Sequence, residues 1–191
     1  IDAIEIDEPL FEAITGEQRV APYLHLSLQA GDDMILKRMK RRHLRDDAIA
    51  LCSRLKAARP EIAFGADLIA GFPTETEAMF ENSLKLVDEC LLAYLHVFPF
   101  SPRPGTPAAR MPQLDRAVIK ERASRLRAKA QEALNRHLDS MVGRVDAALV
   151  EKPGFARAGN FASIRYPADS APRPGALVNI EVSGHDGREL Q

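Results

Sequence analysis

The chain has 191 residues, of which 46% are hydrophobic, so it can bury the core of one medium-sized domain with a small second unit. Its formal net charge of −1 argues for neither a polybasic nor an acidic tail, so any nucleic-acid surface must come from local clusters of Lys and Arg. No run approaches the ~18 apolar residues of a membrane span, and no signal-like run opens the chain. We therefore expect a cytoplasmic protein without a membrane partner.

The chain begins with "IDAIEIDEP", without Met and already within an expected strand over residues 1–6. This start indicates a piece of a longer protein. Cys52 and Cys90 lie far apart in sequence, on segments that we interpret as helices. Two such cysteines are typical of small buried side chains in a reducing compartment rather than of a disulfide framework.

The first part of the chain alternates strands with helices. Apolar patterns predict further strands at 23–28, 62–70 and 93–100, and helices at 46–59, ended by Pro60, and at 75–90. This β-α-β-α-β order predicts parallel strands with crossover helices, in either a barrel segment or an open doubly wound sheet. Because the strands carry His, Gln and Asp among apolar residues, we favour the barrel, whose interior and carboxyl rim form a site.

The second part of the chain changes character. Five prolines from Pro99 to Pro112 exclude a helix or a central strand there. A long basic helix is expected over 114–140, and short β-type runs follow at 144–151, 160–166 and 176–184, which predict a small antiparallel barrel. The fold class is therefore α/β followed by a small all-β unit, with domains at 1–140 and 141–191.

The stretch "GADLIAGFPTETEAMF", residues 65–80, has the form of a strand, a turn and a capped helix. Asp67 lies within the strand, Gly71 shapes the turn, and Thr74 is expected to cap the helix that Glu75 begins. In a barrel this turn would offer free N–H groups and a positive helix end to a small carboxylate or a ribose. An ordinary capped turn explains the pattern equally well.

"HLSLQAGDD" repeats this arrangement one unit earlier, with Gln29 at the strand end, where its amide can donate and accept. A basic run follows, comprising Lys37, Arg38, Lys40, Arg41, Arg42 and Arg45. The run is either a solvated face or a set in which one Arg meets a carboxylate and the others meet phosphates.

His25, Asp67 and His96 all lie on predicted strands. Side chains of these types could bind a divalent metal in a barrel, as in a metal-dependent lyase. No two of them have tight ligand spacing, so packing within the sheet accounts for them equally well.

Three stretches in this order, "HLSLQAGDDMILKRMKRRH", "GADLIAGFPTETEAMF" and "HVFPFSPRPGTPAARMP", closely resemble the C-terminal half of the radical S-adenosylmethionine (SAM) domain of methylthiotransferases. The terminal β-rich unit resembles the TRAM domain, which is similar to OB-type barrels. The third stretch is most similar to the tRNA branch that acts on N6-threonylcarbamoyladenosine, then to the isopentenyladenosine enzymes, then to the ribosomal-protein enzymes. A non-catalytic RNA-binding module remains a second hypothesis.

The resemblance implies an activity, a cofactor and a set of binding residues. Such enzymes add a methylthio group to C2 of an adenosine beside the tRNA anticodon, using SAM and 4Fe-4S clusters. Gln29 and Asp67 match positions that bind the SAM ribose, and Arg41 matches the Arg that meets the methionine carboxylate. The remaining expected contacts are the adenosyl side, at Ile69 and Gly71, and the backbone near adenine, at Val97 and Phe98.

The chain departs from the family in its cysteines. The Cys-x3-Cys-x2-Cys loop is absent, as are three further cysteines for a second cluster, so we expect this chain to bind no cluster and to be inactive alone. Exposed apolar surface on its inner face could drive formation of a homodimer.

The terminal unit offers candidate RNA contacts of two kinds. The cations for phosphates are Arg144, Lys152, Arg157 and Arg165, and the rings for stacking are Phe155, Phe161 and Tyr166. The rings could instead fill the core while the cations are only solvated. Ala158 and Gly159 stand where the family usually has a Gly-Arg-Thr pattern, which weakens the expectation of RNA contact by this face.

Overall fold

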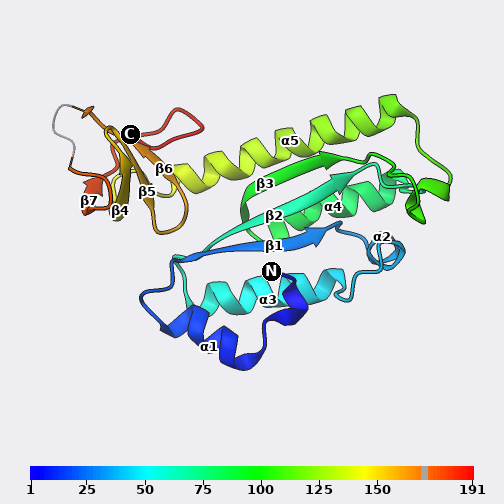
Figure 1. The fold of residues 1–191 in the computed structure, drawn as a ribbon, viewed down its shortest axis with the longest axis horizontal. Coiled ribbons are helices and arrows are strands. Elements are labelled where there is room, and N and C mark those ends of the chain that lie inside the picture. The colour runs from blue at the N-terminus through cyan, green and yellow to red at the C-terminus, as the bar shows by residue number, and fades with distance from the viewer. Residues whose placement is uncertain (169–171) are drawn as a thin grey trace.

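The structure is a computed structural model that describes residues 1–168 and 172–191 (Figure 1). It contains a parallel sheet with its helices, followed by a small antiparallel sheet. The elements in chain order are η1 (Ala3–Glu5), α1 (Glu8–Gly16), β1 (Tyr23–Gln29), α2 (Asp33–Arg38), α3 (Arg45–Ala58), β2 (Ala63–Ala70), α4 (Glu77–Glu89), β3 (Leu92–Pro99), η2 (Ala108–Arg110), α5 (Arg116–Asp139), β4 (Val145–Lys152), β5 (Phe155–Ala158), β6 (Ser163–Arg165) and β7 (Leu177–Glu181).

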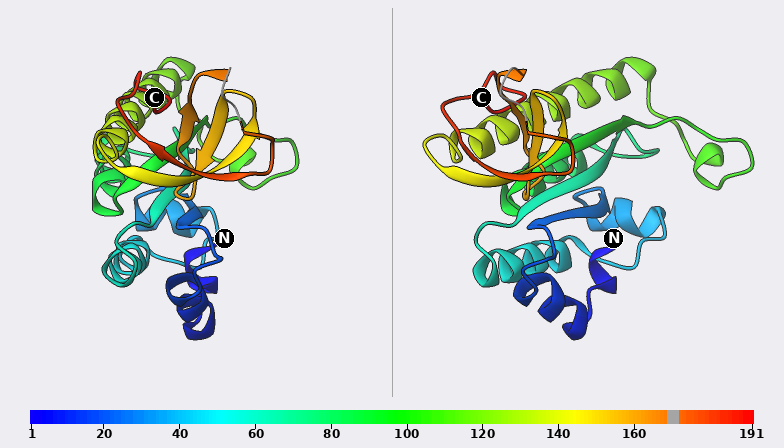
Figure 2. Two further views of the ribbon diagram at one scale, coloured as in Figure 1. Left: turned by 90° about the vertical axis from the view of Figure 1, so that its left-hand side faces the viewer. Right: turned by 60° about the vertical axis from the view of Figure 1, so that its left-hand side comes forward.

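The first sheet has three parallel strands in the order β1-β2-β3, as the alternation of strands and helices predicts. Phe64, Ala66 and Leu68 of β2 are fully buried on the face covered by helices, and Figure 2 shows α3, α4 and α5 along that face. Because side chains alternate along a strand, Asp67 and Ile69 point to the opposite face. We call this face, which the three helices do not cover, the inner face. That inner face is the one on which the polar strand residues of the sequence gather.

The beginning of the chain differs from the predictions in two ways. Residues 1–6 do not form a strand, because Glu5 N donates to Asp2 O at 3.0 Å and closes a 3₁₀ turn. Only Ile1 pairs with β1, donating from its terminal nitrogen to His25 O and accepting from the N–H of Ser27. The apolar residues in this segment pack irregularly against the domain instead of alternating. The helix α1 was not predicted at all.

The helix cap in the "GFPTETE" turn is also shifted from its predicted position. Thr76, not Thr74, caps α4, and its hydroxyl accepts from Met79 N at 3.3 Å. Thr74 has a φ of +67°, in the left-handed region, whereas a capping residue needs the extended backbone found at Thr76.

The second sheet has four antiparallel strands in the order β6-β5-β4-β7. Leu190 adds bridges to Ile164 and to His185. Leu138, near the end of α5, belongs to the core of this sheet, so the long helix joins the two units by packing. β5 was not among the predicted β-type runs. Within the described residues, no helix is both long and apolar enough to cross a membrane.

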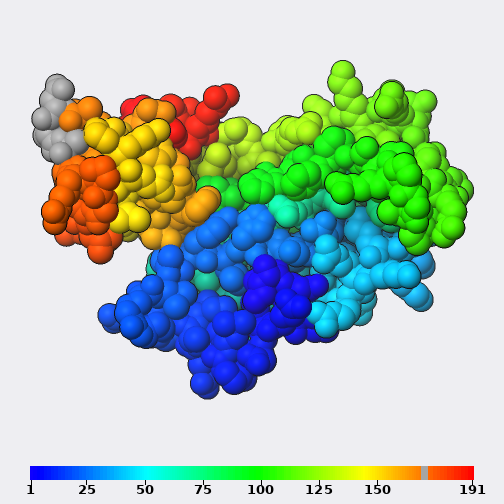
Figure 3. Space-filling model, in the orientation of Figure 1, coloured from blue at the N-terminus to red at the C-terminus, as the bar shows by residue number. Residues whose placement is uncertain are grey.

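The two units meet at the amino ends of the parallel strands. Phe161, beyond β5, stacks on Tyr23 at the start of β1, with ring centroids 4.5 Å apart and planes at 12°. The ring of Tyr94 in β3 stands at 87° to the Phe161 ring, with centroids 5.9 Å apart. Figures 1 and 3 show the small sheet at this end of the molecule, with the segment after β3 at the other. The carboxyl ends of β1, β2 and β3 are therefore clear of the small sheet.

The two cysteines lie within the larger core, as predicted. Cys52 is 1% exposed and Cys90 is fully buried, and both are free thiols. A hydrogen bond with Cys90 and burial together raise the pKa of the Cys52 thiol. Both thiols thus belong to the core on the helix-covered side of the sheet.

Candidate functional site

Asp67 is the centre of a polar cluster on the inner face of the parallel sheet. Its Oδ1 accepts from His25 Nε2 at 3.0 Å and from His96 Nδ1 at 3.2 Å. The Tyr23 hydroxyl lies 3.1 Å from the other nitrogen of His25. Asp67 and His96 are directly paired in the register of β2 and β3, and His25 comes from β1, so three neighbouring strands build this cluster.

A pocket of about 470 Å³ opens beside this cluster, at the carboxyl ends of the strands. This volume falls in the usual range for small-molecule sites. The pocket brings together four of the predicted cofactor residues with the segment that follows β3, and its lining comprises Gln29, Asp67, Ile69, Phe98, Pro99, Phe100, Ser101, Arg103, Thr106 and Ala108.

Gln29 enters this pocket from a strained backbone. Its φ is +67°, and the pairing of β1 with β2 shifts register between Leu26 and Gln29. A non-glycine residue in the left-handed region has an energetic cost, and such residues concentrate at binding sites. The bulge turns the Gln29 amide at the strand end, beside the pocket that Asp67 also lines.

Three predicted cofactor residues do not line the pocket. Arg41 lies 3.6 Å from a carboxylate oxygen of Asp2. Gly71 is buried, and a Cβ on it would lie 2.7 Å from the Ile119 side chain of α5. Val97 packs against the core, and its carbonyl accepts from Arg127 Nη2 at 3.5 Å. Gly71 has a φ of +77°, so the turn itself requires glycine at this position.

A buried ion pair holds this glycine turn in place. The Glu75 carboxylate accepts from Gly71 N at 2.9 Å and from Arg122 Nη1 of α5 at 2.9 Å. Burial raises the pKa of Glu75, and these two hydrogen bonds oppose that rise. The sequence does not predict this pair, because nothing in it indicates which cation of a basic helix meets which acid.

The chemistry of the pocket suits a nucleoside better than a cluster. An amide and a carboxylate can bind ribose hydroxyls, and Ile69 and Phe98 supply apolar surface for a base. His25, Asp67 and His96 could alternatively hold a divalent metal, since their ligand atoms lie within 4.8 Å of one another. Cys52 and Cys90 do not fit as cluster ligands, because they are buried on the opposite side of the sheet.

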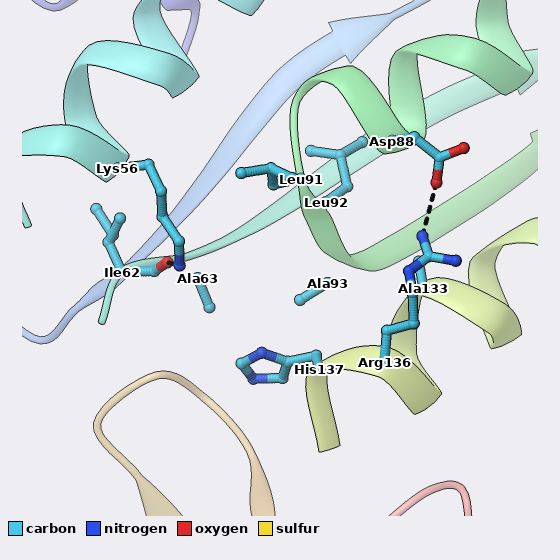
Figure 4. A pocket seen from close by; sticks show the side chains of 10 residues that line it. All are labelled: Lys56, Ile62, Ala63, Asp88, Leu91, Leu92, Ala93, Ala133, Arg136 and His137. Atoms are coloured by element: carbon cyan, nitrogen blue, oxygen red, sulfur yellow. Dashed lines mark hydrogen bonds and ion pairs between the residues drawn. The ribbon is translucent and has the colours of Figure 1, made fainter. Parts of the chain in front are cut away.

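A second pocket, of about 270 Å³, lies near the amino end of β2 and is shown in Figure 4. Two of the cations that line it already have partners: Lys56 Nζ donates to Ile62 O at 2.7 Å, and Arg136 binds Asp88 at 2.6 Å. Burial lowers the pKa of His137 to about 4, helped by Lys56 and Arg144. His137 is therefore neutral near pH 7, and Lys56 is the one cation lining this pocket without an ion pair among the described residues.

The predicted RNA contacts of the small sheet do not form one surface of free cations. Arg157 binds Glu151 at 2.6 Å, and Arg165 forms an ion pair with Glu189. Arg144 and Lys152 are exposed and have no acidic partner within residues 1–168 and 172–191.

The three predicted stacking rings of this unit have different surroundings. Phe161 is 44% exposed and stacks on Tyr23, and Phe155 lies under Lys152, whose Nζ is 5.2 Å from the ring centre. Tyr166 packs against the core of the small sheet. Tyr166 is therefore used as a core residue, whereas the two phenylalanines stay near the surface.

Comparisons with known proteins agree with this geometry. Residues 5–87 match the Radical SAM superfamily. The chain is 52% identical, over 96% of its length, to the threonylcarbamoyladenosine tRNA methylthiotransferase MtaB of Rickettsia prowazekii, of which it spans 43%. It is 44% identical, over 78% of its length, to a tRNA-2-methylthio-N(6)-dimethylallyladenosine synthase of Ruegeria pomeroyi, of which it spans 34%.

A solved structure shares the fold of most of the chain. The coproporphyrinogen III oxidase of Escherichia coli, described as a radical SAM enzyme, superposes with a TM-score of 0.57 at 20% identity. The match covers 70% of this chain and 31% of the oxidase. This likeness shows a shared fold, and the sequence match assigns residues 5–87 to the radical SAM superfamily.

Proposed function

We propose that this chain is the part of a tRNA methylthiotransferase that binds SAM and contacts tRNA. The observation that carries the proposal is the pocket at the carboxyl ends of β1, β2 and β3, which joins Gln29, Asp67, Ile69 and Phe98. The substrate that we propose is N6-threonylcarbamoyladenosine, since the relative at 52% identity carries that name. An isopentenyladenosine substrate is the alternative, because the second relative is 44% identical.

Each residue of the pocket has a separate role in this proposal. The carboxylate of Asp67 accepts from ribose hydroxyls, and the amide of Gln29 donates to or accepts from the same ribose. His25 and His96 fix the orientation of Asp67 through its Oδ1, which leaves Oδ2 for the ligand. Ile69 and Phe98 exclude water from the adenine. Bound SAM would supply an adenosyl radical once it is reductively cleaved.

The cluster chemistry lies outside what the residues of this chain can provide. A 4Fe-4S cluster needs accessible thiolates, and the chain has two cysteines, both buried in the core. We therefore propose that the 191-residue chain binds SAM without cleaving it.

The proposal also includes the barrel to which the parallel sheet belongs and the RNA contacts of the small sheet. The parallel sheet is proposed as part of a radical SAM barrel, with its inner face toward the barrel interior. The four-stranded sheet is proposed as a TRAM-like unit that begins near residue 141, after α5 ends at Asp139. Arg144 and Lys152 are its proposed RNA contacts, with Arg157 and Arg165 next to them.

Binding of SAM to the purified chain tests the proposal directly. Isothermal titration should give one site, and Asp67→Ala should weaken it at least about tenfold, because a hydrogen-bonded charged acceptor is lost. Lys56→Gln, in the second pocket, is the control and should change nothing. Absence of SAM binding, or an equal loss in both variants, would refute the assignment of the pocket.

The same titration with Zn²⁺ in place of SAM distinguishes the SAM site from the alternative metal site. If His25, Asp67 and His96 form a metal site, Zn²⁺ binds the wild type and His96→Ala abolishes that binding. In the SAM proposal, His96→Ala weakens SAM binding much less than Asp67→Ala does, because His25 still binds Oδ1 of Asp67.

A further inference from the structure

The cations of α5 fall into two groups that the sequence does not separate. Four of them face acids of α4 or of its preceding turn: Arg122 binds Glu75 and Glu77, Arg125 binds Glu77 and Glu81, and Lys129 and Arg136 bind Asp88. Their charge is therefore neutralised within the fold. They hold α5 against α4 and are poorly placed to attract a polyanion.

The second group consists of Arg116, Lys120 and Arg127. Within the part of the chain that the structure describes, none of the three has an acidic partner, and all are exposed. They recur at spacings of four and seven residues, so they lie on one face of the helix over a length of about 16 Å. This row is a strip of uncompensated positive charge.

The strip borders a groove of about 310 Å³ between α5 and the end of β3. Pro99, Phe100, Ile119 and Ala123 complete its lining. Pro99 and Phe100 also line the candidate cofactor pocket, so the groove and that pocket share a wall. Arg103, which has no acidic partner among the described residues either, lies on the pocket side of this wall.

We propose that this groove binds the phosphate backbone of an RNA whose modified base enters the adjoining pocket. Phosphates are the expected partners of uncompensated Arg and Lys side chains in a row. Aromatic surface lies beside the cations, at Phe100 in the groove and at Phe98, which is 48% exposed, in the pocket. Cations interleaved with rings are typical of sites for single-stranded nucleic acid, which favours RNA over an acidic peptide.

The kind of RNA in this inference rests on the proposed function, whereas the groove is a surface that the sequence does not distinguish. The predicted RNA contacts were on the small sheet, where Arg157 and Arg165 are paired with glutamates. The groove lies at the opposite end of the parallel strands, toward the end where Figure 1 shows the start of α5. An RNA held in it would present a base to the carboxyl ends of the strands.

The test measures binding of an anticodon stem-loop RNA to the purified chain by fluorescence anisotropy over a range of salt concentrations. The variant combines Arg116→Gln, Lys120→Gln and Arg127→Gln, all at exposed positions, and thermal melting checks that it folds. We expect its affinity to fall about tenfold or more, and the slope of log affinity against log salt to become less steep by about 2.

A matched control removes the same charge elsewhere. Arg19, Arg42 and Arg54 are exposed and pair with glutamates near the beginning of the chain, so the triple Gln variant at these positions changes the net charge equally. An equal loss of affinity in both variants would show a general charge effect and overturn the proposal. Unchanged RNA affinity in the groove variant would also overturn it, as would binding of polyglutamate, but not RNA, through the groove.

Failure of the groove and failure of the cofactor pocket give different results. SAM titration does not involve Arg116, Lys120 or Arg127, so the groove variant should bind SAM as the wild type does. Loss of SAM binding with normal RNA binding would count against the pocket alone. Normal SAM binding with unchanged RNA affinity in the groove variant would count against the groove alone.

Discussion

The carboxyl end of the parallel sheet and the small antiparallel sheet differ in how they use their polar residues. At the carboxyl end, Gln29 and Asp67 come from separate strands and meet in one pocket. In the small sheet, Arg157 and Arg165 each meet a glutamate of the same sheet. The difference shows that a residue type indicates a function only when the fold leaves polar atoms of its side chain open to a ligand, as it leaves Oδ2 of Asp67.

The same lesson applies along α5. Its cations look alike in the sequence, yet Arg122 is 5% exposed and bound to a buried glutamate, whereas Arg116 and Lys120 are exposed beside a groove. Charge complementarity with α4 explains the first group. The second group has no acidic partner within the described residues, although Arg127 donates to Val97 O at 3.5 Å, which makes this group the better candidate for contact with a polyanionic partner.

The largest expected effect concerns the ion pair that supports the carboxyl end. Arg122→Gln removes the partner of Glu75 and leaves a buried carboxylate, so we expect a loss of about 3–5 kcal/mol in the free energy of unfolding. Urea denaturation measures it. Arg125→Gln, on the same helix but in more exposed pairs, should cost about 1 kcal/mol or less. Equal losses would contradict the distinction between buried and exposed pairs.

A pH effect is expected from the junction between the two units. The pKa of His137 is about 4 in the fold, lowered first by burial, against an ordinary value of 6.5. The unfolded chain therefore binds more protons between these values, so stability is full above pH 6.5 and falls as the pH drops toward 4. The loss attributable to His137 is at most about 3 kcal/mol.

His137→Phe isolates this contribution to the pH dependence. The variant keeps an aromatic ring against Tyr94, which lies at 5.4 Å between ring centres, and removes the titrating group. Urea denaturation at several pH values should give a flatter profile between pH 6.5 and 4 than the wild type. An unchanged profile would mean that other groups account for the acid sensitivity.

A smaller effect is expected from the aromatic contact that joins the small sheet to the parallel sheet. Phe161→Ala removes the ring stacked on Tyr23 and should cost about 1–2 kcal/mol, because both an aromatic pair and buried area are lost. Phe161→Tyr keeps the stack and should be nearly neutral. If thermal melting of the Ala variant matches the wild type, the two units are not coupled through this contact.

The smallest effect is expected within the small sheet. Arg165→Gln should change the free energy of unfolding by less than about 0.5 kcal/mol, because the Arg165 side chain is 63% exposed. It should also lower RNA affinity less than Lys152→Gln, since Arg165 is paired with Glu189 and Lys152 has no acidic partner in the described residues. The reverse order in an anisotropy titration would restore Arg165 as an RNA contact.

Much of the fold follows from local patterns in the sequence. β1, β2, β3, α3, α4 and α5 all lie where apolar periodicity predicts them, because each buries one face against the core. Residues 1–6 are an exception, because they form an apolar run but no strand. Within this segment, Ile1 is the residue that hydrogen-bonds to β1. The short β5 was missed because four residues carry too little pattern.

The sequence predicts which residues meet at the candidate site only where their position along a strand determines this. Gln29 and Asp67 end up together because the carboxyl ends of neighbouring parallel strands meet at one edge. Glu75 with Arg122, and the unpaired row from Arg116 to Arg127, depend on how α5 rotates against α4. No local pattern in the sequence contains that rotation, so these features required the structure.

Chemical-shift changes in the NMR spectrum of the chain on titration with SAM test the central claim most directly. The account predicts changes at the backbone amides of Gln29, Asp67, Ile69 and Phe98, at the carboxyl ends of the three strands. It predicts none in the small sheet or around His137. Changes concentrated in those two regions, or no change at any SAM concentration, would contradict it.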